Sequence, residues 1–316
     1  MIRILLILLA IVCTIFSGCS PAPDTGANAV GNSASDASSA EVAELRAMMP
    51  KIEPFFQKMG KPQSYDWLGS HNEPGQTFDQ YLAADAPRPT AQRQTIYVLP
   101  LGTFTDEQKK IVSTTADYLK AFYDLPVKEL PSRPMPPAQK DGDIRITSIR
   151  GVSKLKNQYR TGFIMDSVLK PSLPADAAAL IAFTVEDLYP DKTMSFVFGQ
   201  ASMSDRVGVW SLFRLQQDAD HDKFLRRTLK IAAHETGHMF GFWHCTKYEC
   251  VMSGTNYLGE TDRRPIDACP EDTAKICLIS RSDPVKRYKA LADFCRKNGL
   301  ADEAASFDKK AAAVSK

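Results

Sequence analysis

Three histidines and one glutamate occur in a spacing that could hold a metal ion and use it. Within residues 231–252, His234, Glu235, His238 and His244 follow the order HExxHxxGxxH. If the first part of this stretch is helical, His234 and His238 lie four residues apart on one face, and both imidazoles can reach the same ion. Glu235 can then address a metal-bound water without binding the metal itself. Three neutral imidazoles with a fourth position left to water form the open arrangement of a catalytic zinc site.

Gly241 and Met252 complete the pattern. Gly241 is where the helix can end, because glycine enters the left-handed backbone conformation without steric cost. The chain can then turn sharply and present His244 as the third ligand. A methionine downstream of this motif is typical of metzincins, in which it occupies a tight turn beneath the metal. We therefore expect Met252 to be the residue of that turn.

The alternative is an ordinary amphipathic helix that carries histidines. The chain has only five histidines in 316 residues, and three of them fall within these eleven positions. Such clustering in the register of a known metal motif favours the zinc site. Phe242 and Trp243 flank the turn before His244, and we expect both to pack beneath the metal.

Cysteines next to the motif carry a resemblance to one family. Cys245 directly follows the third histidine. Together with Cys250 and Met252 it forms the run HCxxxxCxM, which resembles the archaemetzincins. In that family a later CxxC pair completes a four-cysteine site for a second, structural zinc. Here Cys269 stands where the pair begins, the fourth position reads Asp272, and the next cysteine is Cys277. The resemblance, which runs from about residue 180 to 300, implies a zinc site with Cys277 as fourth ligand. Two disulfides are the alternative, because an exported protein sits where disulfides persist.

The same resemblance implies a zinc-dependent metallopeptidase with Glu235 as general base and acid and a peptide or protein as substrate. A zinc-bound surface binding protein with little or no peptidase activity is the alternative, and the choice between endopeptidase and aminopeptidase stays open. Some metzincins carry a tyrosine two residues after the methionine of the turn. That position is Gly254 here, and Tyr257 is the nearest substitute.

The chain begins like an exported protein. Residues 1–18 read as a lipoprotein-type signal peptide, because Arg3 precedes a thirteen-residue, largely apolar run too short to span a bilayer. The run ends in FSGC, which resembles a lipobox with Cys19 as the lipidated residue. Residues 19–40 are poor in large apolar side chains and read as a disordered tether. We expect a lipid anchor on the membrane surface, at the extracytoplasmic side of a bacterial cell envelope. A plainly cleaved secretory peptide is the alternative.

Composition restricts the other partners. The formal net charge of +2 is close to neutral, so it implies no nucleic-acid partner. With 44% hydrophobic residues, the chain can bury one core of full domain size. The sequence indicates no oligomeric state.

The elements that must position the motif follow from hydrophobic patterning. Residues 41–93 read as a helical and irregular N-terminal extension, and residues 94–316 as the catalytic domain. The resemblance implies an α+β fold with α/β/α layers, in which a twisted mixed sheet is packed with helices. An edge strand, either 195–199 or 206–215, would pair with an extended substrate. The expected strands are 95–101, 143–149, 178–183, 195–199 and 206–215, and the expected helices are 41–59, 105–122, 223–240, 285–298 and 301–314.

Overall fold

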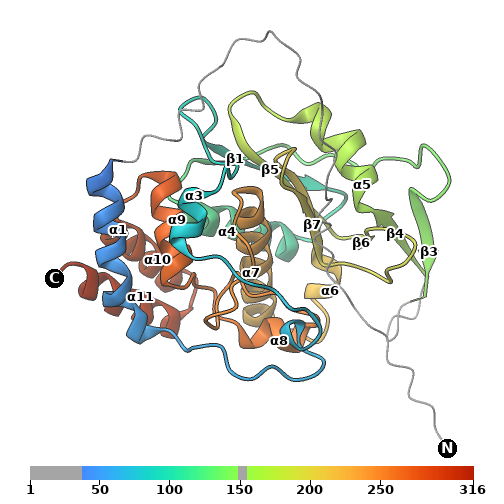
Figure 1. Cartoon of the computed structure of the whole chain (residues 1–316). Helices are drawn as coiled ribbons and strands as arrows, with labels where there is room; N and C mark the ends of the chain where they lie inside the picture. Colours follow the sequence, from blue (N-terminus) through green and yellow to red (C-terminus); the bar gives the residue numbers. More distant parts are fainter. Residues whose placement is uncertain (1–37, 149–154) are drawn as a thin grey trace, which may run out of the picture.

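A five-stranded mixed sheet lies between two layers of helix in the computed structural model, which describes residues 38–148 and 155–316 (Figure 1). In spatial order the strands are β2 (Val127–Glu129), β1 (Thr95–Leu101), β5 (Ala177–Thr184), β8 (Val207–Ser211) and β7 (Gly199–Ser202). Neighbouring strands are parallel, except that the edge strand β7 is antiparallel to β8. This arrangement confirms the expected α+β fold class.

Alternate side chains of the central strands enter two separate cores. On β1, Ile96 and Val98 pack into the larger core, whereas Tyr97 and Leu99 face the smaller one. Successive side chains of a strand point to opposite faces, so a strand that is covered on both faces needs a nearly continuous apolar run. The sequence TIYVLPL satisfies that need, and β5 is buried along its whole length.

The smaller core lies beneath a short helical segment. Helix α5 (Thr161–Ile164) continues into a π-helical turn (Met165–Leu169) and a 3₁₀ turn (Lys170–Ser172). Side chains of this segment pack on β5 and β8. A second sheet beside it contains β3 (Ile144–Thr147), β4 (Lys156–Arg160) and β6 (Asp187–Tyr189).

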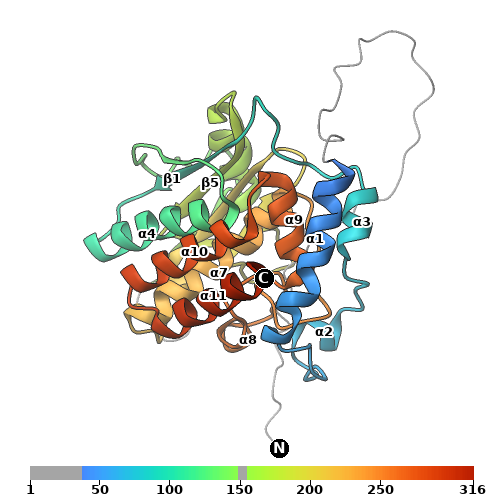
Figure 2. The same cartoon turned by 90° about the vertical axis from the view of Figure 1, so that its left-hand side faces the viewer.

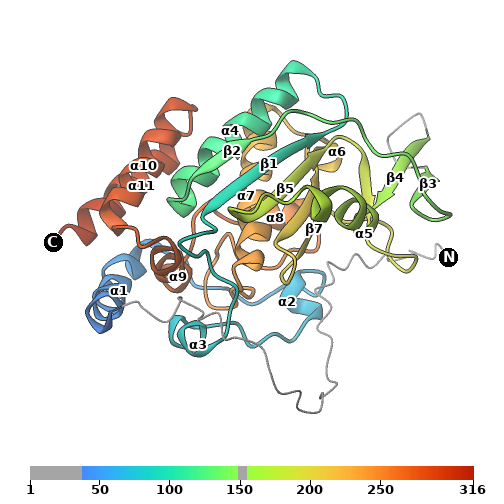
Figure 3. The same cartoon turned by 90° about the horizontal axis from the view of Figure 1, so that it is seen from above.

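Two long helices, α4 (Asp106–Tyr123) and α7 (His221–Met239), cover the other face of the large sheet, and Figure 3 shows them side by side. Helix α4 begins with a capping box, in which Thr105 and Gln108 exchange side-chain to backbone hydrogen bonds. Helix α7 carries the histidine motif, and its N-cap is Asp220.

The C-terminal helices enclose the larger core. Helices α10 (Pro284–Lys297) and α11 (Ala301–Val314) pack side by side, and α10 also packs on α4 (Figure 2). The other helices after β8 besides α7 are α6 (Leu212–Leu215), α8 (Leu258–Arg263) and α9 (Pro270–Ser280).

The N-terminal extension shares this core with the rest of the chain. Helix α1 (Ser39–Ile52) packs on α9 and α11 and is followed by a 3₁₀ turn (Glu53–Phe55). Residues 57–87, here called the N-terminal arm, then include α2 (Trp67–Ser70) and α3 (Phe78–Ala83). The sequence indicated a helical and irregular extension, and the helix expected at 41–59 ends earlier than expected, at Ile52, while α2 and α3 are two further short helices.

Two strand predictions and one boundary need correction. The strand expected at 195–199 begins only at Gly199, and β7 is the edge strand. The strand expected at 206–215 ends at Ser211, whose hydroxyl accepts the backbone N–H of Phe213 and starts α6, and β8 is an inner strand. Helix α1 begins at Ser39, inside the stretch expected to be a tether, because Ser38 caps it.

Several predictions for the N-terminus concern residues that the structure does not describe. The expected signal peptide, the lipidation site Cys19 and most of the tether lie outside the described residues. Among the helices of residues 38–148 and 155–316, none has the length and apolarity needed to cross a bilayer.

Candidate metal centres

Helix α7 places the first two histidines of the motif together. His234 and His238 are separated by one helical turn, and their Nε2 atoms lie 3.0 Å apart. The His234 side chain is buried and that of His238 is partly exposed, and desolvation lowers the pKa of His238 to about 3. The pKa of His234 is also held well below its usual value by burial. Both imidazoles are therefore neutral, which is the protonation state that binds a metal ion.

The end of α7 brings in the third histidine. The N–H of Phe242 binds the carbonyl of Gly237, and the N–H of Gly241 binds that of His238, which is the hydrogen-bond pattern of a Schellman cap. Gly241 has φ = 79°, as the sequence predicted for a glycine that ends the helix. The chain then reverses, so that the His244 ring centroid lies 5.1 Å from that of His234 and 4.9 Å from that of His238. One ring nitrogen from each of the three histidines lies within 4.8 Å of the others.

The far side of each ring is already hydrogen bonded. Nδ1 of His234 lies 2.9 Å from the carbonyl oxygen of Val251, and Nδ1 of His238 lies 2.7 Å from that of Phe242. Nδ1 of His244 lies 2.9 Å from a carboxylate oxygen of Glu73. These acceptors place the proton on each Nδ1 and leave Nε2 as the metal donor. The three histidines therefore fit a zinc ion with an open fourth position.

Glu235 lies on α7 next to the first histidine and is buried. Burial raises the pKa of its carboxyl to about 7. A general base with a pKa near the working pH combines a substantial ionised fraction with real basicity. A bound cation would oppose the rise by stabilising the carboxylate.

Met252 packs directly on α7 beneath the histidines. Its sulfur lies 2.7 Å from the position that a Cβ atom on Gly237 would occupy. The carbonyl of Met252 also accepts the backbone N–H of Cys245 at 2.8 Å, so the turn is hydrogen bonded to the chain segment that follows His244. Of the two aromatic residues before His244, Phe242 is fully buried, as predicted, but Trp243 is 50% exposed beside the site.

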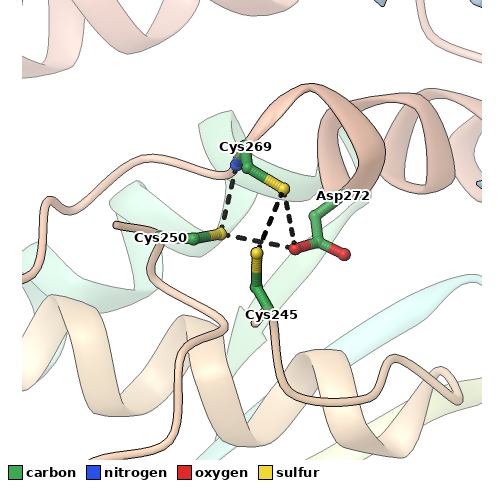
Figure 4. A group of neighbouring side chains, drawn as sticks. All are labelled: Cys245, Cys250, Cys269 and Asp272. Carbon is green, nitrogen blue, oxygen red and sulfur yellow. Dashed lines mark hydrogen bonds between the residues drawn. The ribbon is translucent and has the colours of Figure 1, made fainter. Parts of the chain in front are cut away.

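A second group of possible metal ligands begins at Cys245, the residue directly after His244. The thiols of Cys245, Cys250 and Cys269 converge with the carboxylate of Asp272 (Figure 4). Sγ of Cys245 lies 3.7 Å from Sγ of Cys269, and Oδ2 of Asp272 lies 3.3 Å from Sγ of Cys250 and 3.2 Å from Sγ of Cys269. Tetrahedral zinc with ordinary bond lengths separates two sulfurs by about 3.8 Å and a sulfur from an oxygen by about 3.5 Å. The four side chains fit such a site.

The fourth position of this group corrects the sequence-based assignment. Asp272 lies at the start of α9, close to Cys269, whereas Cys277 is eight residues beyond Cys269 and about 12 Å further along the helix. Cys277 is buried elsewhere and is not part of the group. Two disulfides would need Cys277 as the fourth partner, so its position also argues against that alternative.

The surroundings of the cysteine group suit anionic ligands. Backbone N–H groups of Cys269 and Met252 point to Sγ of Cys250 at 3.1 and 3.4 Å. Burial raises the pKa of Asp272, and the buried ammonium of Lys275, 2.8 Å from its Oδ1, partly offsets that effect. The lysine would also balance part of the negative charge of three thiolates and a carboxylate around one Zn²⁺.

The N-terminal arm contributes side chains that the motif does not indicate. Besides Glu73 on His244, the indole of Trp67 meets the His244 ring edge to face at 5.1 Å. The same indole covers Gly254, where a Cβ atom would lie 2.4 Å from Cδ1 of Trp67. The Tyr257 hydroxyl is hydrogen bonded to the Asp66 carboxylate. A hydrophilic stretch with isolated aromatics gives no sequence signal for these contacts, because they depend on the arm's path across the domain.

Comparison with known proteins agrees with the arrangement of the site. The sequence profile described as "Peptidase family M54" matches residues 152–277. Archaemetzincin-2 from Pongo abelii is 31% identical over 290 residues, covering 79% of this chain and 78% of that protein. Archaemetzincin-2 from Homo sapiens is 32% identical over 262 residues, covering 72% of this chain and 71% of that protein.

Solved archaeal structures are similar to a smaller part of the chain. The crystal structure of archaemetzincin from Methanopyrus kandleri covers 59% of this chain and 96% of its own, with 27% identity and a TM-score of 0.47. The sequence identity to the longer relatives and the profile match establish the family. This chain belongs to the archaemetzincins, a family of zinc metallopeptidases.

Proposed function

We propose that this protein is a zinc-dependent peptidase that hydrolyses peptide bonds, with Glu235 as general base and general acid. The observation that carries the proposal is the convergence of His234, His238 and His244. Each ring is held by a hydrogen bond at Nδ1, so Nε2 is free for the metal. Glu235 is buried beside this centre and is not part of the ligand group.

The chemistry divides between the metal and the protein. When bound, zinc lowers the pKa of a coordinated water from about 15.7 towards about 7 and polarises the scissile carbonyl. Glu235 accepts the proton of the attacking water and delivers it to the departing amine, so that its carboxyl is regenerated in the ionised form. The hydrogen bonds at the Nδ1 atoms keep the three rings in place during this cycle.

The edge strand β7 offers a place for the substrate backbone. It packs against α7, and β8 pairs with one of its edges, while no strand of residues 38–148 and 155–316 pairs with the other. An extended peptide that pairs with β7 would gain main-chain hydrogen bonds with little dependence on sequence. The half-exposed Trp243 next to His244 is available to contact a side chain of that peptide.

A second zinc at the cysteine group would have a structural role. Cys245, Cys250, Cys269 and Asp272 fill all four positions of a tetrahedron, so no position remains for substrate or water. Because Cys245 follows His244 directly, this site would fix the chain on the far side of the third catalytic ligand.

Peptide hydrolysis tests the proposal. The purified protein should cleave a mixture of peptides, and Glu235→Gln should abolish cleavage while zinc remains bound at the histidines. Peptides with free and with blocked N-termini would separate aminopeptidase from endopeptidase action. The alternative binding protein would be supported if no peptide is cleaved and a component of the cell envelope is bound tightly.

We also propose that the protein is lipid-anchored through Cys19 on the extracytoplasmic side of a bacterial membrane. The support is the sequence alone: the short apolar run of residues 4–16, the small residues before Cys19, and the low-complexity stretch to residue 40. Incorporation of a labelled fatty acid into the wild type, and its loss in Cys19→Ala, tests this anchor. A plainly cleaved secretory protein would be released without label.

A further inference from the structure

The hydrogen-bond partner of Nδ1 differs between His244 and the other two histidines of the centre. Nδ1 of His234 and of His238 faces a backbone carbonyl, from Val251 and Phe242. Nδ1 of His244 instead faces both carboxylate oxygens of Glu73, at 3.1 and 2.9 Å. A backbone carbonyl is still present when the side chain of its residue is substituted. The support of His244 therefore depends on one side chain, 171 residues earlier in the sequence.

Glu73 is itself held against the loop that presents His244. Its neighbour in the arm, Gln76, bonds that loop twice: Nε2 lies 3.3 Å from the carbonyl of Gly241, and Oε1 accepts the N–H of Trp243 at 3.3 Å. Gly75 lies so close to Thr246 that a Cβ atom there would meet its hydroxyl at 2.4 Å. The arm therefore contacts the loop on both sides of His244.

Burial strengthens the contact between the two side chains. The His244 side chain is 6% exposed and that of Glu73 is 26% exposed. Trp67 covers the pair from one side, because its indole meets the His244 ring edge to face. A hydrogen bond between a ring N–H and a carboxylate in such partly dry surroundings is stronger than the same bond in water.

We propose that Glu73 is a positioning residue for the metal ligand His244 and that the N-terminal arm is thereby part of the zinc site. The carboxylate holds the proton on Nδ1, orients the ring and makes Nε2 a better donor. Its negative charge also lies close to a centre in which three neutral imidazoles would surround a divalent cation. This inference rests on the proposed zinc site. It adds that the zinc affinity of the three histidines also depends on a residue outside the HExxHxxGxxH motif.

Two substitutions separate the charge from the hydrogen bond. Glu73→Gln keeps an amide oxygen that can accept from Nδ1–H, but it removes the negative charge. Glu73→Ala removes both. Because Glu73 is a quarter exposed, neither change leaves a large buried cavity. Asp79→Asn is the control: Asp79 also lies in the arm and pairs with Arg46, but on the exposed surface.

Metal affinity is the measurement. The zinc-free full chain is titrated with Co²⁺, whose thiolate complexes show a sulfur-to-metal charge-transfer band, so that the cysteine and histidine sites are followed separately. Chelator competition then gives the zinc affinity of the histidine site. We expect a loss of about 10- to 100-fold in Glu73→Ala, a smaller loss in Glu73→Gln, and none in Asp79→Asn. The cysteine site should be unchanged in all three variants.

The possible failures are distinct. If Glu73→Ala binds zinc at the histidines as tightly as the wild type, Glu73 has no positioning role, although the proposed peptidase stands. If the wild type binds no metal at the histidines, the proposed function and this inference both fall. Thermal unfolding of the metal-free variants must match that of the wild type. A general loss of stability that accounts for the weaker binding would reduce Glu73 to a structural contact.

Discussion

The sulfur of Met252 lies 2.7 Å from the place where a Cβ atom on Gly237 would stand, and its terminal methyl carbon lies 3.0 Å from it. Gly237 is inside α7, between His234 and His238. A glycine inside a helix normally costs about 1 kcal/mol relative to alanine. The glycine is therefore best explained by the close approach of the methionine turn to the helix that carries two ligands.

A double-mutant cycle tests this packing. Gly237→Ala alone should lower the free energy of unfolding by about 1–3 kcal/mol, because the new methyl group overlaps the thioether. In the background Met252→Ala the same change should be close to neutral or stabilising. The next neighbour of the new methyl group, Cδ2 of Phe242 at 3.3 Å, needs to shift by only a few tenths of an ångström, and alanine favours the helix. Denaturant unfolding of the four proteins gives the coupling energy. Additive effects of the two substitutions would contradict the contact.

The zinc content of the purified protein distinguishes the two metal centres. We expect two zinc ions per chain in the wild type, one in His238→Ala and one in Cys269→Ser, by elemental analysis. Asp272→Ala should also lose the ion at the cysteine site or bind it more weakly, whereas Cys277→Ser should keep both, because Cys277 lies outside the group. Loss of an ion in Cys277→Ser with full retention in Asp272→Ala would reverse our assignment of the fourth ligand.

The end of α7 gives a prediction with a matched control. Gly241 and Gly299 both follow a helix in the left-handed conformation, with φ of 79° and 74°. A Cβ atom at 299 would meet nothing within 4 Å, but at 241 it would lie 2.6 Å from Cβ of Ala86. Gly299→Ala should cost about 1–2 kcal/mol of stability from backbone strain alone. Gly241→Ala should cost more and should also weaken zinc binding at the histidines, because the turn presents His244.

Thermal unfolding and chelator competition on these two variants check the comparison. Equal stability losses with unchanged zinc affinity would show that the contact with Ala86 does not constrain the turn.

Some parts of the fold and of the site could be predicted from the sequence, and others could not. The motif residues and the elements with strong patterns, such as 95–101 and 301–314, could be read directly, because metal ligation and helix capping depend on local spacing. The edge strand was misplaced because β7 is short and only half apolar, so tertiary pairing decides its register. Cys277 was preferred as a ligand for its residue type, whereas helix geometry brings Asp272 to the site. Glu73 could not be found, because its role depends on a contact across 171 residues.

Acid should loosen the attachment of the N-terminal arm at Asp66. Burial on its own raises the pKa of this carboxyl. Hydrogen bonds from Arg263, from the backbone of Gln63 and from Tyr257 outweigh that effect and hold the pKa below its ordinary value of 3.8. Because the folded-state pKa is lower than the unfolded one, Asp66 contributes stability that is fully present above pH 3.8. This contribution is lost as the pH falls through the folded-state pKa.

Asp66→Asn should therefore be less stable than the wild type at pH 7, and the difference should shrink as the pH falls below 3.8. Denaturant unfolding of both proteins across this range, each in the metal-free form so that zinc release does not contribute, measures the difference directly. The matched control is Asp106→Asn, whose carboxylate is exposed and pairs with Lys109 on the surface of α4. Surface pairs contribute little, so this control should be nearly silent at pH 7. A stability difference for Asp66→Asn that stays constant down to acid pH would mean that the contact acts through packing, and that the charge of Asp66 does not hold the arm.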